Sequence, residues 1–244
     1  MVLITLAFVI VFAAVHLGIG RLKFLSNAPR SAWLSAAGGV AVAYVFLHVL
    51  PELAAHRATF ADELRASESM AEALVYTVSF AGLVIFYGLE RAVKTARRSG
   101  AADAGHGAGR GAGVFWIHIA SFAVYNLIIG YLLLHREETG LTPLLIYGVA
   151  MAVHFVTSDF GLREDHQARY DRVGRWIIAG GVIGGWLLGL AVALPDLWIG
   201  ALFAFLAGGV ILNVLKEELP EERESNFGAF LAGAVSYAAL LWAI

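Results

Sequence analysis

Two segments of the sequence, GGVAVAYVFLHVLPE (38–52) and GGVILNVLKEELPE (208–221), share one pattern. Each contains a pair of glycines, then an apolar run, then Leu-Pro-Glu. Gly39 and Gly208 each lie twelve residues before the proline of their segment. By position, the repeat matches His48 with Glu217. Two distant segments with the same spacing indicate an internal repeat.

The composition predicts a membrane protein. Hydrophobic residues make up 59% of the 244 residues, charged residues only 15%, and the mean hydropathy is +0.75. Apolar runs of about twenty residues recur, and such runs are typical of membrane-spanning helices. Because a bilayer requires every backbone polar group to be paired internally, continuous apolar runs favour a helical bundle.

Composition also excludes some partners and chemistries. The net charge of −2 gives no basic face for nucleic acid, so no nucleic-acid partner is expected. The absence of cysteine excludes disulfides and thiolate metal sites. No basic side chain precedes the first apolar run, which favours a first spanning helix over a cleaved signal peptide.

We predict an all-α integral membrane protein with eight transmembrane helices. The expected spans are 2–20, 33–51, 72–92, 114–134, 142–162, 176–194, 197–215 and 227–244. Lys and Arg number 14 in the connections after the odd-numbered spans and 3 in the others. Since cytoplasmic loops carry the excess of Lys and Arg, we expect both termini outside.

This orientation makes the repeat an inverted one. The second span would run outward and the seventh inward, so the two Leu-Pro-Glu motifs would end on opposite faces of the membrane. Inverted-topology repeats are common in alternating-access transporters. We expect one transmembrane domain over residues 1–244, with a flexible cytoplasmic linker at about 94–113, where Gly and Ala are abundant.

Ionisable side chains within the spans are the candidate functional residues, because burying them in a membrane is costly. His48 and Glu52 lie four residues apart on one helix face and offer a nitrogen and an oxygen ligand to a divalent ion. The alternative is a helix end at which Glu52 is simply in water. Pro51, between them, frees the carbonyl of Leu47 and can kink the helix.

The remaining candidates lie in the fourth, fifth and seventh spans. They are His118, Asn126, His154, Asp159 and Glu217.

Each of these has a structural alternative. The stripe of His154 and Ser158 also suits helix packing, Asp159 lies one turn from Arg163 and can pair with it, and Glu217 stands in an acidic run. His16 and Glu90, near inner ends, are expected to serve structural roles.

The chain resembles the ZIP (Zrt/Irt-like) family of divalent metal transporters. The resemblance rests on eight expected helices, the long third connection, FLHVLPE at 46–52 and the span ending in Leu-Pro-Glu at 219–221. It implies a transporter that lies in a cell membrane, such as a bacterial inner membrane, and moves Zn²⁺, Fe²⁺ or Mn²⁺ into the cytoplasm. It implies no enzymatic activity.

The family's transport site is altered in this chain. Where the family carries His-Asn and then an acid in the fourth span, the chain has Tyr125, Asn126 and Ile129. In the fifth span the family histidine is kept as His154, while Ser158 stands where a glutamate is usual.

The loss of acids leaves alternatives open. Either the remaining candidates converge to replace the missing carboxylates, or the chain is a ZIP-like subunit that does not transport and acts through a homodimer or a membrane-complex partner. A third alternative is transport of another solute, or proton-linked signalling. A retinal protein is one version of it, because Lys216 lies at the end of the seventh span.

Overall fold

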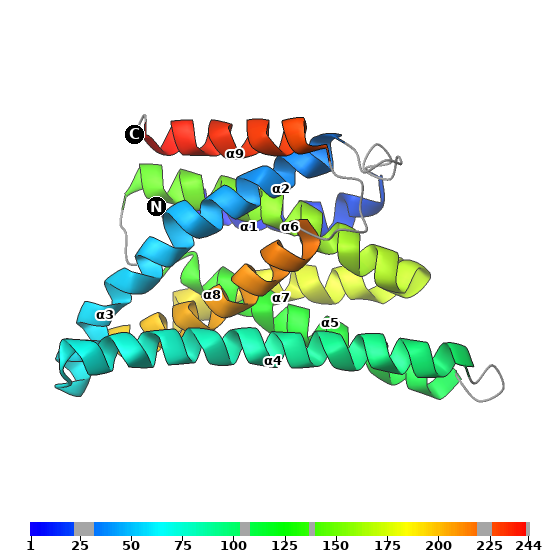
Figure 1. Ribbon diagram of the computed structural model, residues 1–244, viewed down its shortest axis with the longest axis horizontal. Coiled ribbons are helices and arrows are strands. Elements are labelled where there is room, and N and C mark those ends of the chain that lie inside the picture. The colour runs from blue at the N-terminus through cyan, green and yellow to red at the C-terminus, as the bar shows by residue number, and fades with distance from the viewer. Residues whose placement is uncertain (22–31, 103–107, 137–139, 219–225, 243–244) are drawn as a thin grey trace.

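The computed structural model describes residues 1–21, 32–102, 108–136, 140–218 and 226–242, and in these residues the chain forms helices and no strand. Figure 1 shows the helices packed in a bundle, with α4 along one edge and α9 along the other. The helices are α1 (Val2–Gly18), α2 (Ala32–Tyr44), α3 (Leu50–Leu64), α4 (Glu68–Ala102), α5 (Ala108–Leu132), α6 (Leu141–Arg169), α7 (Arg175–Ala191), α8 (Asp196–Glu218) and α9 (Phe227–Trp242). Three short helical turns join them: η1 (Ile19–Arg21), η3 (Val45–Val49) and η4 (Tyr170–Gly174).

The all-α prediction is confirmed, and the bundle has the helix lengths of a multi-pass membrane protein. Among the described residues, six helical stretches are long and apolar enough to cross a membrane. One of them, Leu141–Ala191, contains both α6 and α7, and the apolar helix Phe227–Trp242 is shorter. Each of the eight predicted spans coincides with helix for most of its length.

The second predicted span does not end at Pro51. Helix continues from α2 through the π-helical turn η3 into α3, and ends only at Arg65, whose left-handed backbone (φ 50°) caps it. In η3 the N–H of Leu50 donates to the carbonyl of Val45, five residues earlier. This wider turn changes the hydrogen-bond register just before Pro51, which has no N–H to contribute, so the proline is accommodated at the start of α3.

The long connection after the third predicted span is also more helical than expected. Residues 94–102 continue α4, and 108–113 belong to the start of α5. Of the predicted linker, only residues 103–107 lie outside the described part of the chain.

The chain reverses direction between α6 and α7 (Figure 1). Gln167 has non-helical dihedral angles (φ 37°, ψ −111°), which break the helix, and the π-helical turn η4 follows. The two spans predicted over 142–162 and 176–194 are therefore separate helices.

Glycines bring three pairs of helices into direct backbone contact: α2 with α9, α4 with α8, and α5 with α7. In the pair α2 and α9, a Cβ on Gly39 would strike the carbonyl of Phe230, and one on Gly233 would strike the carbonyl of Ala36. Such contacts require glycine, because any side chain would push the two backbones apart. The pair is therefore held at a distance that only these residues allow.

The pair α4 and α8 is built in the same way. A Cβ on Gly208 would strike the carbonyl of Ser79, and one on Gly82 would strike the carbonyl of Phe205. Both glycines thus face backbone rather than a flexible side chain, so neither contact can be relieved by a rotamer change.

The pairs α2–α9 and α4–α8 correspond residue by residue. Adding 169 to the residue numbers of Gly39 and Ala36 in α2 gives Gly208 and Phe205 in α8, which make the equivalent contacts. An offset of 151 converts Ser79 and Gly82 of α4 into Phe230 and Gly233 of α9. The offset of 169 is the one that aligns the two Leu-Pro-Glu segments of the sequence.

Corresponding helices run in opposite directions. In Figure 1, α2 runs from right to left and α8 from left to right, while α4 runs from left to right and α9 from right to left. The first residue of the chain and the end of α9 lie at the same end of the bundle.

Substituting these glycines by alanine tests the contacts. Alanine normally stabilises a helix over glycine by roughly 1 kcal/mol. At Gly39 and Gly208 the added Cβ should instead separate the helices and lower the free energy of unfolding by about 1–3 kcal/mol. Thermal unfolding in detergent measures this.

Gly180→Ala is the matched control, because a Cβ at Gly180 meets nothing within 4 Å. It should be neutral or stabilising. If Gly39→Ala and Gly208→Ala are as stable as Gly180→Ala, the backbones do not approach one another as closely as described.

Candidate functional site

The centre of the bundle holds a hydrogen bond between Tyr125 of α5 and His154 of α6. The Tyr125 hydroxyl lies 2.9 Å from Nε2 of His154, and both residues are buried. Nδ1 of His154 has no hydrogen-bond partner. The pair thus joins a phenol and an imidazole from two neighbouring helices.

Asn126, which follows Tyr125, is engaged with its own helix. Its Nδ2 donates to the carbonyl of Phe122 at 2.9 Å, while its buried Oδ1 has no hydrogen-bond partner. The side chain therefore offers one free amide oxygen, a weak ligand for a divalent ion compared with a carboxylate.

Asp159 pairs with His16, and the expectation that it would pair with Arg163 is wrong. Oδ2 of Asp159 lies 2.7 Å from Nδ1 of His16 on α1, and the two side chains are almost completely buried. Arg163 instead binds Asp171 through two hydrogen bonds, of 2.8 and 3.0 Å. Sequence spacing gave no signal for the His16–Asp159 pair, since 143 residues separate its members.

His118 belongs to a cluster on α5, two helical turns before Tyr125. Its Nδ1 lies 2.8 Å from Nε2 of His166, and its Nε2 lies 3.4 Å from Oε2 of Glu90. The other oxygen of Glu90 lies 3.0 Å from Nζ of Lys216 and 3.6 Å from Nζ of Lys94. Glu90, for which the sequence predicts a structural role, links the histidine pair to two lysines.

Sequence reasoning missed most of this cluster. Glu90 and Lys94 are four residues apart on one helix, which was a usable signal for that pair. His166 lies beyond the predicted end of the fifth span, and Lys216 comes from a helix far along the chain. Neither residue had a local pattern that connected it to His118.

His48 and Glu52 share a helix face as predicted. His48 lies in η3, its ring stacks on Tyr44 with centroids 5.3 Å apart, and its Nε2 is 3.8 Å from Oε2 of Glu52. The alternative of a simple water-exposed helix end does not describe Glu52, because only 10% of its side chain is exposed in the bundle.

Glu217 lies in the last turn of α8, but its side chain is outside the described residues. The predicted role of this side chain, and its positional match to His48, stay predictions.

The candidate ligands are thus distributed over separate pairs. In the described part of the chain, no group of three or more His, Asp or Glu side chains is arranged to hold a metal ion. Of the four residues in the alternative of a converging site, His118, Asp159 and His48 each lie in a separate contact, and the fourth, Glu217, has its side chain outside the described residues. What the geometry provides is a series of imidazole–carboxylate and imidazole–phenol pairs, each able to share a proton.

Comparison with known proteins adds no assignment: no family model, no curated protein and no solved structure matches the chain.

Two added ligands test the geometry around His154. Ser158 follows His154 by one helical turn and is buried. The double variant Tyr125→His and Ser158→Glu would give two imidazoles and a carboxylate, and three protein ligands suffice for a zinc site with one open position. We expect it to bind one Zn²⁺ at least about tenfold more tightly than the unchanged protein, since even outer groups change affinity about 10–100-fold.

Calorimetric titration measures the affinity, and adding His154→Ala to the double variant should remove the gain. A folded double variant with no gain in Zn²⁺ binding would show that positions 125, 154 and 158 do not face one centre.

Proposed function

We propose that the chain is a ZIP-like transporter that moves a divalent cation into the cytoplasm. It would have eight membrane spans with both ends outside, and Zn²⁺, Fe²⁺ or Mn²⁺ as substrate. The observation that carries the proposal is the correspondence between the α2–α9 and α4–α8 contacts, with helices in opposite directions. Two inverted copies of one unit are an architecture of alternating-access transporters.

The distribution of polar pairs supports a path through the bundle. His48 and Glu52 lie at the α2–α3 junction, and Tyr125 and His154 lie at the centre of the bundle. His118, two helical turns before Tyr125 on α5, lies beside Glu90. Each pair provides at least one ligand that first-row divalent metals accept.

Protons are the natural exchange partners of the cation along this path. A metal binds only the deprotonated form of an imidazole or a carboxylate, so its arrival at one of the imidazole–carboxylate pairs would release to water the proton that the pair shares. The altered centre, with one imidazole, one phenol and one amide oxygen, would hold the ion weakly and release it readily. This is the sense in which the proposed site differs from a carboxylate-rich one.

Uptake by purified protein in liposomes tests the proposal. We expect Zn²⁺, Fe²⁺ or Mn²⁺ to accumulate inside, and His154→Ala to slow the initial rate at least about tenfold, the scale on which groups around a metal alter its binding. His106→Ala, which removes an imidazole from the 94–113 connection, should transport at the unchanged rate. Folded protein that takes up none of the three ions would refute the proposal.

A second candidate function is favoured by one observation. Because no group of three ligands was found in the described residues, the chain could be a ZIP-like membrane subunit that binds a second copy or another membrane protein without transporting. Stable co-purification with a membrane partner, together with absence of metal and of uptake, would favour this function. Uptake by the chain alone would exclude it.

The assignment to a multi-pass membrane protein is supported by the long apolar helices. Residence in a cell membrane, such as a bacterial inner membrane, belongs to the proposal. Fractionation of the expressed chain would test it.

A further inference from the structure

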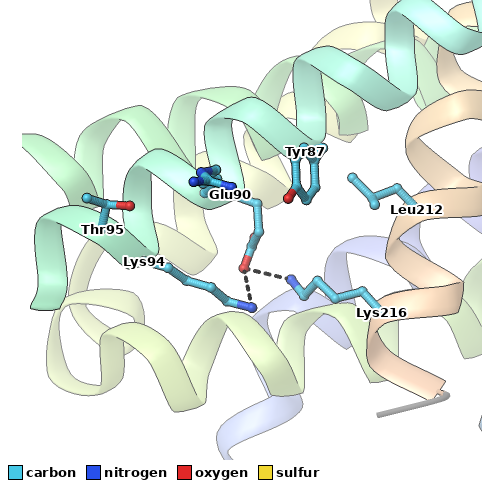
Figure 2. A pocket seen from close by; sticks show the side chains of 7 residues that line it. Tyr87, Glu90, Lys94, Thr95, Leu212 and Lys216 are labelled. Carbon is cyan, nitrogen blue, oxygen red and sulfur yellow. Dashed lines mark ion pairs between the residues drawn. The ribbon is translucent and has the colours of Figure 1, made fainter.

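A cavity of about 390 Å³ opens between α4 and α8, away from the central Tyr125–His154 pair. Figure 2 shows it with Glu90 and Lys94 on one helix and Lys216 on the other. Its lining residues are Tyr87, Glu90, Arg91, Lys94, Thr95, Leu212 and Lys216. A volume of this size is in the range of small-molecule sites.

The lining is strongly cationic for a protein with so little charge. Arg91, Lys94 and Lys216 oppose the single carboxylate of Glu90, and two of the three lysines of the chain are here. Both lysine ammonium groups lie within 4 Å of the same Glu90 oxygen, at 3.0 and 3.6 Å.

Glu90 also contacts a group outside the cavity lining. Its other oxygen faces His118 at 3.4 Å. The carboxylate therefore holds the two ammonium groups close together while the cavity keeps an excess of positive charge among its described lining residues.

The cavity also has an apolar side and lies at the end of two apolar stretches. The spans predicted over 72–92 and 197–215 end next to its lining residues Lys94 and Lys216. Leu212 and the Tyr87 ring lie one turn deeper than Lys216 and Arg91 respectively. In the orientation proposed above, on which this inference rests, this is the cytoplasmic end of the bundle.

We propose that this cavity binds the phosphate of an anionic phospholipid headgroup. Ammonium and guanidinium groups form charge-assisted hydrogen bonds with phosphate oxygens. Basic pockets between transmembrane helices at the cytoplasmic face suit anionic headgroups. The phosphate would lie against Lys94, Lys216 and Arg91, while the glycerol and first methylenes contact Leu212 and Tyr87. The cavity would thereby fix the end of α8 against α4 at the membrane surface.

The proposal predicts opposite effects for the two kinds of charge in the cavity. Each lysine near a membrane surface contributes about fivefold to anionic-lipid affinity. Lys94→Gln with Lys216→Gln should therefore weaken binding about thirtyfold. Glu90→Gln should tighten it, because the carboxylate competes with phosphate for the same ammonium groups.

Binding of short-chain lipids to the detergent-solubilised full chain tests the proposal. Dioctanoyl-phosphatidylglycerol is titrated against the protein, with dioctanoyl-phosphatidylcholine and inorganic phosphate as comparison ligands. We expect saturable binding of phosphatidylglycerol and at least about tenfold weaker binding of the other two.

Two variants control for charge and folding. Lys94→Arg with Lys216→Arg keeps the charge and should keep the binding. Arg172→Gln removes an exposed cation from η4, outside the cavity, and should leave the affinity unchanged.

Three results would overturn the proposal. Equal affinity for phosphatidylglycerol and phosphatidylcholine would show that headgroup charge is not read. Weakening by Glu90→Gln as large as that by the lysine variants would make the cluster merely structural. Inorganic phosphate binding as tightly as the lipid would identify a soluble phosphate as the ligand instead.

Discussion

The structure depends on helix contacts in which glycine lets two backbones touch. Within a bilayer, helices gain no hydrophobic energy by leaving lipid, so close packing of small residues must hold them together. Gly39 against Phe230 and Gly208 against Ser79 meet this requirement in the two corresponding pairs. The helix α5, which carries Tyr125 and His118, makes the same kind of contact with α7 through Gly130, Gly181 and Gly185.

The polar interior obeys a second constraint, which is that buried ionisable groups need partners. His16 pairs with Asp159, His118 with Glu90, and His154 with Tyr125. Removing one member of a buried pair typically costs about 3–5 kcal/mol. Each of these buried imidazoles thus lies beside a carboxylate or a phenol, which lowers the cost of burying it.

The sequence predicted what local pattern controls and failed where distant segments meet. Glycine spacing and Leu-Pro-Glu anticipated the correspondence of α2 with α8, and the four-residue spacing anticipated the shared face of His48 and Glu52. The helical continuation through Pro51 was missed, since a π-helical turn leaves no mark in hydropathy. The pairing of Asp159 with His16 was missed too, because its choice over Arg163 is decided by packing across 143 residues.

The central claim is that the pairs α2–α9 and α4–α8 are inverted copies within a membrane. Side-specific cysteine labelling tests this claim most directly. The chain has no cysteine, so single substitutions report without background. Ser69→Cys precedes most of α4, and Ser225→Cys precedes α9, so the two mark equivalent starts in the two copies. In intact cells a membrane-impermeant maleimide should label position 69 from outside, and label position 225 only after permeabilisation. Labelling of both positions from the same side would contradict the inverted arrangement.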